Sequence, residues 1–421
     1  MESTYDVIIV GAGPAGIFTA YELMQKDPTI DILLIDKGLD IYKRHCLILE
    51  KKATKCPVKK DGVSGCYPAC SITSGFGGAG AYSDGKFNIT SEFGGWMTEY
   101  LAHDEEEQLI DYVDSINIKH GAPEKITDPT TEKVKEIEKR DLAVGLKLLR
   151  AKVRHLGTEK NLEILKNIYE SLVGKITMLY SHEVKDLLIE NNHIKGVTVQ
   201  NIKKGSQDFY APNVVLVPGR DGSSFLSDIC QRYEINRSNN QVDIGVRVET
   251  NDEIMEEINE HLYEGKFIYR ASVGTTVRTF CSNPSGHVVI ENHSGTMLAN
   301  GHAYKDAKLG SRNTNFALLV SNTFEEPFNK PNEFAHKVSH LANMLSSGSI
   351  ILQKYGDLLA GRRTTDKRLK EGFVTPTLKE AVPGDLGLVL PYNTMKSLIE
   401  MIEALDKVTP GIASEHTLFY G

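Results

Sequence analysis

The sequence predicts an α/β protein in which a Rossmann-like nucleotide-binding domain is combined with a second, mostly antiparallel α+β domain. Two observations predict the first domain: an apolar run leads directly into a glycine-rich turn, and a second apolar run ends at an acidic residue. Alternating segments from about residue 241 onward predict the second domain. The length of 421 residues is enough for two or three domains.

The glycine-rich turn is a dinucleotide-binding motif. An apolar run over 5–10 is typical of a buried strand, and it leads into the three glycines of G-x-G-x-x-G. The motif needs one glycine for a tight turn, one for close approach of the backbone to a pyrophosphate and one for helix packing. We therefore predict that Gly11, Gly13, Pro14, Ala15 and Gly16 bind the cofactor at the N-terminus of a helix.

An acidic residue and two basic residues follow the second predicted strand. This strand ends at Asp36, which stands 20 residues after Gly16, the spacing at which a carboxylate meets a ribose hydroxyl. NAD and FAD share this arrangement, and the motif alone does not separate them. Lys37 and Arg44 are candidates to face the phosphates or the adenine, and they are equally plausible as solvated loop residues.

A second glycine-rich segment covers 75–86, with five glycines between positions 75 and 85. Such a segment permits close approach of the backbone to a flat ring, as in flavoproteins whose backbone N–H groups lie along the flavin. A flexible linker is the alternative, and it is disfavoured because this segment contains aromatic and charged residues. The predicted cofactor contacts here are Gly77, Gly78, Ala79, Gly80, Ser83 and Gly85.

Several segments resemble one protein family in their order along the chain. They are GFGGAGAYSDGK (75–86), RHLGT (154–158), VVLVPGRDG (214–222), VRTFC (277–281), NTNFALL (313–319), GDL (356–358), GRR (361–363) and GDL (384–386). The family is that of uncharacterised FAD-dependent dehydrogenases, or NAD(P)/FAD-dependent oxidoreductases, of glutathione-reductase-like fold. The resemblance implies this fold and FAD as the cofactor, with Val184, Gly219 and Arg220 among the further contacts. It implies no particular substrate.

Further strands are predicted around these motifs. Segments 176–180, 184–189 and 193–200 alternate like antiparallel strands, whereas 214–217 is typical of a buried parallel strand. The parallel strand brings Gly219 to the sheet edge that carries the first glycine motif, because ligands bind at the carboxyl ends of such strands. We therefore expect these loops to converge on one dinucleotide.

These elements set the expected domain boundaries. The FAD-binding domain comprises 1–95 and 151–238, a helical insertion covers 96–150, and a substrate domain covers 239–421. In the substrate domain, strands are predicted at 242–249, 267–270, 276–281, 287–291 and 315–320, with helices over 333–345 and 394–405.

Basic residues and a histidine occur at the ends of segments in the substrate domain. In a chain of net charge −8, such residues would attract an anionic substrate toward the flavin. We predict Arg278, Arg362 and Arg363 as substrate contacts, and His302 as a proton donor to a developing carbanion. The alternatives are that the arginines are solvated or paired with nearby acids, and that the histidine has a structural role.

Four of the six cysteines, at positions 46, 56, 66 and 70, lie close together in the sequence. We predict reduced thiols and no metal, because the spacing is not the tight C-x-x-C of most metal and redox sites. One alternative is zinc or an iron–sulfur cluster held by Cys56, Cys66 and Cys70. The other is a Cys66–Cys70 disulfide that exchanges with the flavin.

Composition excludes several classes of partner. The negative net charge, with no polybasic block, disfavours nucleic acid and anionic membranes. The start of the chain has no signal-peptide pattern, and no run of 18 apolar residues occurs. We therefore predict a soluble, cytoplasmic protein whose partner is a small-molecule substrate.

Together these features predict an FAD-dependent oxidoreductase that exchanges a hydride between flavin N5 and a small organic substrate, with anionic substrates favoured. No second G-x-G-x-x-G occurs in the substrate domain, so a separate electron donor or the substrate itself supplies the electrons. The alternatives are a flavin monooxygenase and a non-catalytic scaffold with weak flavin binding. Members of the family typically end with a Gly-Asp segment and a helix aimed at the flavin, so the resemblance also implies weak FAD retention for a chain ending at Gly421.

Overall fold

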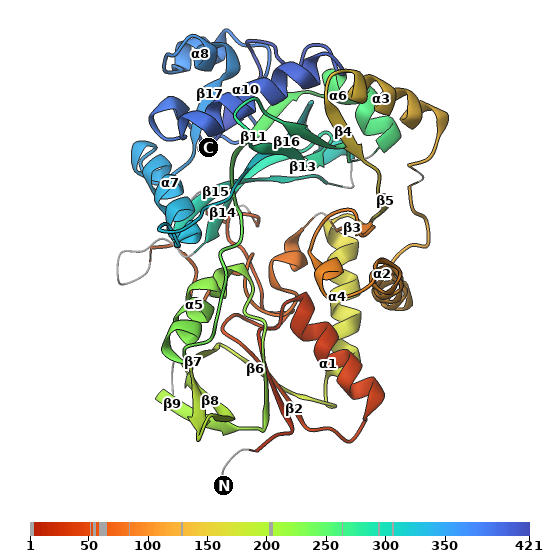
Figure 1. Ribbon diagram of the computed structural model, residues 1–421, viewed down its shortest axis with the longest axis vertical. Coiled ribbons are helices and arrows are strands. Elements are labelled where there is room, and N and C mark those ends of the chain that lie inside the picture. Colours follow the sequence, from red (N-terminus) through yellow and green to blue (C-terminus); the bar gives the residue numbers. More distant parts are fainter. Residues whose placement is uncertain are drawn as a thin grey trace.

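The computed structural model describes residues 4–50, 52–53, 56–58, 65–83, 85–127, 129–201, 205–262, 264–293, 295–304 and 307–421. These residues form two domains, one above the other in Figure 1, each built around its own sheet. The mixed α/β class predicted from the sequence is confirmed.

The first domain contains a parallel sheet of four strands in the order β10-β1-β2-β6. The strands are β1 (Val7–Val10), β2 (Ile32–Asp36), β6 (Thr177–Tyr180) and β10 (Asn213–Leu216). The two central strands, β1 and β2, are almost entirely buried, as expected for parallel strands that are covered on both faces. The prediction that 176–180 belongs to an antiparallel group is wrong, because this segment pairs in parallel with β2.

Different elements cover the two faces of this sheet. Val7 and Ile9 pack with helices α1 (Pro14–Lys26) and α4 (Thr158–Leu172). Ile8 and Val10 face the opposite way, because successive side chains of a strand alternate between the faces of the sheet. They pack with α5 (Ser223–Arg232) and with an antiparallel sheet of β7 (His182–Glu190), β8 (His193–Asn201) and β9 (Gly205–Tyr210).

The second domain is built on an eight-stranded sheet in the order β18-β17-β19-β11-β16-β13-β12-β4. In chain order the strands are β4 (Leu146–Leu149), β11 (Val242–Asn251), β12 (Lys266–Arg270), β13 (Thr276–Asn283), β16 (Asn313–Asn322), β17 (Ile351–Lys354), β18 (Val382–Pro383) and β19 (Leu418–Tyr420). The longest pairing is antiparallel and joins β11 to β16 over their whole lengths. The mostly antiparallel character of this domain therefore agrees with its alternating sequence.

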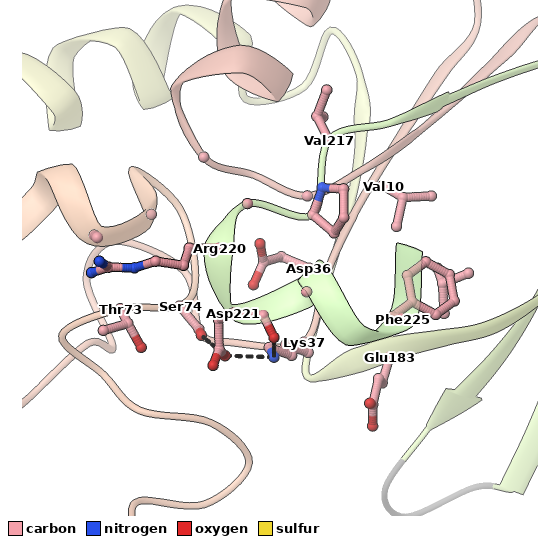
Figure 2. Close-up of a pocket in the computed structure, with 18 of the residues that line it drawn as sticks. Val10, Asp36, Lys37, Thr73, Ser74, Glu183, Val217, Arg220, Asp221 and Phe225 are labelled. Atoms are coloured by element: carbon pink, nitrogen blue, oxygen red, sulfur yellow. Dashed lines mark hydrogen bonds and ion pairs between the residues drawn. The ribbon is translucent and has the colours of Figure 1, made fainter. Parts of the chain in front are cut away.

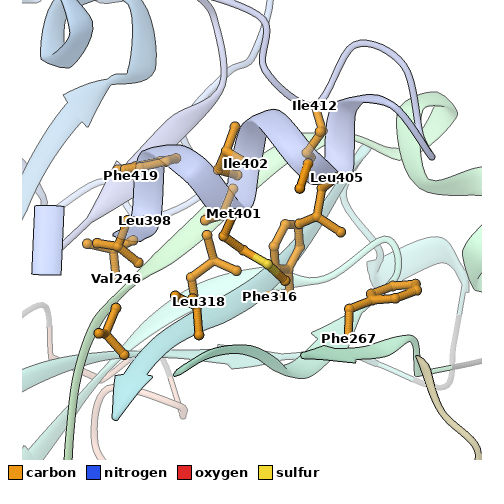
Figure 3. Close-up of a cluster of buried hydrophobic side chains, with 14 of the residues drawn as sticks. Val246, Phe267, Phe316, Leu318, Leu398, Met401, Ile402, Leu405, Ile412 and Phe419 are labelled. Carbon is orange, nitrogen blue, oxygen red and sulfur yellow. The ribbon is translucent and has the colours of Figure 1, made fainter. Parts of the chain in front are cut away.

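Helices and a hairpin cover this second sheet. On one face, α3 (Glu132–Ala143), α6 (Asp252–Leu262) and α10 (Tyr392–Asp406) bury apolar side chains. Figure 3 shows Leu398, Met401 and Leu405 of α10 above Phe316 and Leu318 of β16. On the other face lies the hairpin β14 (His287–His293) and β15 (Thr296–His302), flanked by α7 (Pro331–Leu345). The hairpin lies between the second sheet and the first domain (Figure 1).

The predicted helical insertion, 96–150, is divided between the two domains. Helix α2 (His103–Lys119) contributes Ile116 to the core of the first domain and contacts β3 (Lys86–Ile89), which pairs with β5 (Lys152–His155). Helix α3 and strand β4 instead complete the second domain, because β4 pairs with β12 at the edge of its sheet.

The remaining elements are short. They are the 3-10 helices η1 (Gly78–Tyr82), η2 (Met97–Glu99), η3 (Arg220–Gly222), η4 (Ala307–Leu309) and η5 (Leu386–Leu388), with helices α8 (Tyr355–Leu359) and α9 (Asp366–Lys370). Strand β19 lies inside the second sheet, between β11 and β17. Within the described residues, every helix is too short or too polar to cross a membrane.

Candidate functional site

A cavity of about 570 Å³ lies at the carboxyl ends of the parallel strands. Val10 ends β1, Asp36 ends β2 and Val217 directly follows β10, and all three line the cavity (Figure 2). Ligands of open α/β sheets bind at this edge of the sheet. The cavity is therefore the candidate functional site.

The glycines of the first motif form one wall of the cavity. A Cβ atom on Gly11 would lie 2.3 Å from the carbonyl oxygen of Val217, and the φ of this residue is +113°. A Cβ atom on Gly16 would lie 1.9 Å from the carbonyl oxygen of Gly11. Gly13 differs, because the nearest atom to its hypothetical Cβ is 4.0 Å away, on Gly78. Gly11 and Gly16 are therefore required by packing, whereas Gly13 leaves open space at the N-terminus of α1, where a pyrophosphate fits.

Asp36 joins the end of β2 to the glycine turn. Its carboxylate accepts hydrogen bonds from the backbone N–H groups of Ala12, at 2.8 Å, and Gly38, at 2.7 Å. Each carboxylate oxygen has a further acceptor position, so the group can also receive a ribose hydroxyl from the cavity. The ribose contact that the sequence spacing predicts for Asp36 stays a prediction.

Lys37 also lines the cavity, where its ammonium group is paired with a carboxylate. Nζ of Lys37 lies 2.5 Å from Oδ2 of Asp221, and Oγ of Ser74 donates to the same oxygen at 3.2 Å (Figure 2). Asp221 thus ties together three segments that are far apart in the sequence. The charge of Lys37 is largely balanced before any phosphate binds.

Arg44 does not line the cavity, in contrast to its predicted contact with phosphate or adenine. Its side chain is buried and donates to the backbone carbonyl oxygens of Ser71 (2.9 Å), Ile72 (2.8 Å), Phe76 (2.6 Å) and Gly78 (2.8 Å). Burial lowers the pKa of Arg44 to about 10, so it remains charged at neutral pH. Arg44 therefore stabilises the conformation of the glycine-rich loop by donating to its backbone carbonyl oxygens.

The second glycine segment contributes to the cavity in part. Gly78, Ala79 and Gly80 line it, and their contact with a cofactor stays a prediction. Gly77 and Gly85 have φ values of +89° and +66°, and added Cβ atoms would press on Leu165 and on Asn161, both in α4. These two glycines serve packing. The predicted cofactor residues outside the cavity lining are Ala15, Gly16, Arg44, Gly77, Ser83 and Gly85, whereas Val184, Gly219 and Arg220 are part of it.

The four predicted catalytic residues do not line the cavity. Arg278 forms an ion pair with Asp243 on the second sheet, and Nε of Arg362 lies 2.7 Å from Oδ1 of Asp357. Arg362 and Arg363 follow α8, which lies at the top of the second domain in Figure 1. His302 ends β15 and packs edge-on against Tyr304, with ring centroids 4.5 Å apart. The prediction that these residues meet the substrate at the cofactor has no support in the structure, because Arg278 and Arg362 are paired with carboxylates away from the cavity.

The structure places two other histidines, His182 and His293, at the cavity. His293, the last residue of β14, lines the cavity, and its Nε2 atom lies 3.1 Å from Oε2 of Glu291. Nη2 of Arg220 lies 3.1 Å from the same Nε2 atom and 3.8 Å from Oε2 of Glu291, and Asn300 donates to the other oxygen of Glu291. The predicted strand, 287–291, ends before His293, whereas β14 continues to His293 and its two-residue spacing places Glu291 and His293 on one face.

Glu291 is held in its charged form. Burial alone would raise the pKa of its carboxyl group, but hydrogen bonds from His293 and Asn300 and the nearby charge of Arg220 outweigh burial and lower that pKa. The pair of Glu291 and His293 thus presents an ionised carboxylate next to an imidazole at the cavity wall.

The cysteines give no support for a metal centre. None of the six cysteines, which all lie in the described part of the chain, forms a disulfide, and the described residues contain no group of three or more His, Cys, Asp or Glu side chains that could hold a metal ion. Burial raises the pKa of the Cys56 thiol, which disfavours the thiolate needed for metal binding or disulfide exchange.

Comparison with known proteins gives one family match. Residues 241–421 match the family described as "FAD-dependent protein, C-terminal domain-like". The match covers most of the second domain, and it supports FAD as the cofactor. No curated protein matches the sequence.

Solved structures show only distant similarity. L-amino acid deaminase from Proteus vulgaris has a TM-score of 0.34 at 13% identity, covering 66% of this chain and 68% of that one. Glycerol-3-phosphate dehydrogenase from Bacillus halodurans, complexed with FAD, has a TM-score of 0.36 at 11% identity, covering 77% of this chain and 48% of that one. Quinol fumarate reductase from E. coli has a TM-score of 0.29 at 15% identity, covering 60% and 39%. No function is inferred from these similarities.

Proposed function

We propose that this chain is an FAD-dependent oxidoreductase that acts on a small organic molecule. The observation that carries the proposal is the cavity at the ends of the parallel strands, with glycine backbone on its walls and open space beside Gly13. The family match over 241–421 supports the same cofactor independently of that cavity. Bound FAD would supply the group that accepts or gives up a hydride.

The residues present fit a dinucleotide. The N-terminus of α1 offers backbone N–H groups that have no partner inside the helix, and these suit a pyrophosphate. Asp36 offers carboxylate oxygens for a ribose. The segment from Gly78 to Gly80 has almost no side chain, so its backbone can approach a flat ring. These residues bind and orient the cofactor.

The proposed substrate class rests on a cation at the cavity. Arg220, whose side chain is 71% exposed, is a cation at the cavity, and His293 of the second domain lies beside it. We therefore propose a small organic substrate, and Arg220 favours an anionic one. Arg278, Arg362 and Arg363 do not contribute to this preference, because they lie outside the cavity lining. The predicted separate electron donor remains a prediction.

The proposal is tested on the full-length protein, reconstituted with FAD and freed of excess cofactor. We expect a yellow protein whose flavin absorption bleaches under anaerobic conditions with a member of a panel of hydroxy acids, amino acids and dihydronicotinamides. NADPH oxidation coupled to oxygen uptake would instead identify a monooxygenase. A protein that takes up no flavin would contradict the proposal and favour a scaffold role.

A further inference from the structure

We infer that Arg220 binds the carboxylate of the substrate and that Glu291 competes for the same guanidinium group, so that the cavity selects a monocarboxylate over a dianionic phosphate ester. The inference rests on the proposed function, because it names the substrate class of the same cavity. It assigns Arg220 to the substrate, whereas the sequence predicts this residue as a cofactor contact.

The first observation is that Arg220 is an accessible cation at the cavity. Lys37 and Arg220 are the lysine and the arginine among the described lining residues. Nζ of Lys37 lies 2.5 Å from a carboxylate oxygen of Asp221, whereas the side chain of Arg220 is 71% exposed and its Nη2 atom lies 3.8 Å from Oε2 of Glu291. The second distance is longer than a hydrogen bond. An anion that enters the cavity therefore meets in Arg220 a charge that is still available.

The second observation is that the guanidinium group has unused donors. The hydrogen bond that it forms with the described residues joins Nη2 to Nε2 of His293, at 3.1 Å. A guanidinium group carries five N–H donors, and its planar fork matches a carboxylate with two parallel hydrogen bonds. A substrate carboxylate can therefore bind to the fork without displacing His293.

The third observation is that Arg220 lies where the second domain reaches the cavity. Its Nη2 atom contacts His293, at the end of strand β14 in the hairpin. The next residue, Asp221, accepts a hydrogen bond from Oγ of Ser74, in the loop that leads into the second glycine-rich segment. In Figure 2 the side chain of Arg220 extends in the direction of Thr73, from the same loop. An anion on Arg220 therefore lies between that loop and the second domain, where a substrate is expected.

Glu291 reduces the positive charge that Arg220 offers. Burial raises the pKa of the Glu291 carboxyl group, but hydrogen bonds from His293 and Asn300 and the charge of Arg220 outweigh burial and lower it, so the group is ionised. One of its oxygens contacts His293 and the other accepts from Asn300, so Glu291 does not depend on Arg220 as a donor. Its negative charge, 3.8 Å from Nη2, still offsets part of the guanidinium charge.

This balance of charges suits a monoanion. The charges of Lys37 and Asp221 already offset each other, so Arg220 is the cation that remains among the described lining residues. A carboxylate brings a single negative charge and two oxygens that match the fork. A phosphate ester brings a second charge, which Glu291 repels. We therefore expect hydroxy acids or amino acids as substrates, in preference to phosphate esters.

The test measures the binding of three matched probes to the full-length protein: benzoate, its neutral isostere benzamide, and phenyl phosphate. Binding is followed at about pH 8, where a phosphate ester carries two charges. The readouts are the change in flavin absorption of the FAD-loaded protein and, without FAD, saturation-transfer NMR of the probe. We expect benzoate to bind at least about tenfold more tightly than either of the other probes.

Variants separate the roles of the two residues. Arg220→Gln should weaken benzoate binding at least about tenfold and leave FAD affinity unchanged, and Arg220→Lys, which keeps the charge but loses the fork, should recover part of the loss. Glu291→Gln should strengthen benzoate binding about threefold, because it removes the competing charge and keeps the shape. It should also narrow the preference over phenyl phosphate. Arg237→Gln, which changes an exposed arginine outside the cavity lining, is the control and should bind benzoate like the wild type.

The gain in Glu291→Gln distinguishes competition from a structural role, because structural damage at the cavity wall would weaken binding. Several results would overturn the inference: no binding of benzoate to the wild type, phenyl phosphate bound as tightly as benzoate, unchanged benzoate binding in Arg220→Gln, or a loss of FAD affinity in that variant. Unchanged or weaker benzoate binding in Glu291→Gln would do the same. A protein that takes up no FAD would instead contradict the proposed function, because benzoate binding is also measured without the cofactor.

Discussion

Oδ2 of Asp36 accepts a hydrogen bond from the backbone N–H of Ala12 at 2.8 Å, and this contact joins the second parallel strand to the glycine turn that follows the first. The same carboxylate lines the cavity and also accepts from the N–H of Gly38. One side chain therefore fixes the shape of two loops and offers an acceptor to a ligand.

Removing the charge of Asp36 should weaken both FAD binding and the fold. In Asp36→Asn, one of the two accepted hydrogen bonds is lost, which should lower the free energy of unfolding by about 1–2 kcal/mol. Loss of the ribose contact should weaken FAD binding by at least about tenfold. Urea unfolding and titration of FAD by fluorescence measure the two effects. Asp111→Asn, on the exposed face of α2, is the control, and equal FAD affinity of the two variants would contradict the role of Asp36.

Arg44 should matter for stability and, through the loop, for cofactor binding. Replacing it by methionine leaves four backbone carbonyl oxygens without their charged donor. We expect a loss of about 3 kcal/mol or more in the free energy of unfolding, because buried acceptors lose their partners. Lys43→Met is the matched control, since the Lys43 side chain is 75% exposed and its Nζ lies 2.8 Å from Oδ2 of Asp40. A loss in Arg44→Met no larger than in this control would show that the loop does not depend on the guanidinium group.

Asp141 should make the stability of the protein depend on pH. This α3 residue is fully buried, neither of its carboxylate oxygens has a hydrogen-bond partner, and burial raises its pKa from 3.8 to about 7. The folded protein therefore holds a proton that the unfolded chain releases near its ordinary pKa. Stability falls as the pH rises between these two values, by at most about 4 kcal/mol, and the loss is complete above the folded-state value.

Asp141→Asn removes this titration. The difference in free energy of unfolding between the variant and the wild type should grow from about pH 4 to about pH 7 and then remain constant. Urea unfolding at several pH values measures it, with Asp111→Asn as an exposed control. A difference that does not change with pH would show that Asp141 is not protonated in the folded protein.

Local patterns in the sequence predict the parts of the site that depend on backbone shape. The glycine turn, Asp36 and the segment from Gly78 to Gly80, which the motifs single out, line one cavity, and close backbone approach dictates the glycines at Gly11 and Gly16. The sequence does not show which groups a charged side chain contacts. The sequence shows that Arg44 is cationic, but only packing shows that its donors are taken up by backbone carbonyl oxygens.

Residues that act between the domains could not be predicted in the same way. His293 stands at the end of an ordinary alternating strand, and its meeting with Arg220 depends on how the hairpin of β14 and β15 packs on the first domain. The division of segment 96–150 between the two domains could not be predicted either. It depends on the pairing of β4 with β12, a strand more than a hundred residues later in the chain. No local pattern records such long-range pairing.

The central claim is that the cavity beside Gly13 holds the FAD pyrophosphate, and binding of FAD to Gly13→Val tests it most directly. The φ of Gly13 is −76° and its hypothetical Cβ has open space around it, so the variant should fold with unchanged stability while its side chain occupies the cavity. Gly95→Val is the matched control, because no atom lies within 4 Å of the added Cβ. We predict at least about tenfold weaker FAD binding for Gly13→Val and wild-type binding for Gly95→Val. Wild-type FAD affinity in a folded Gly13→Val protein would contradict the assignment of this cavity.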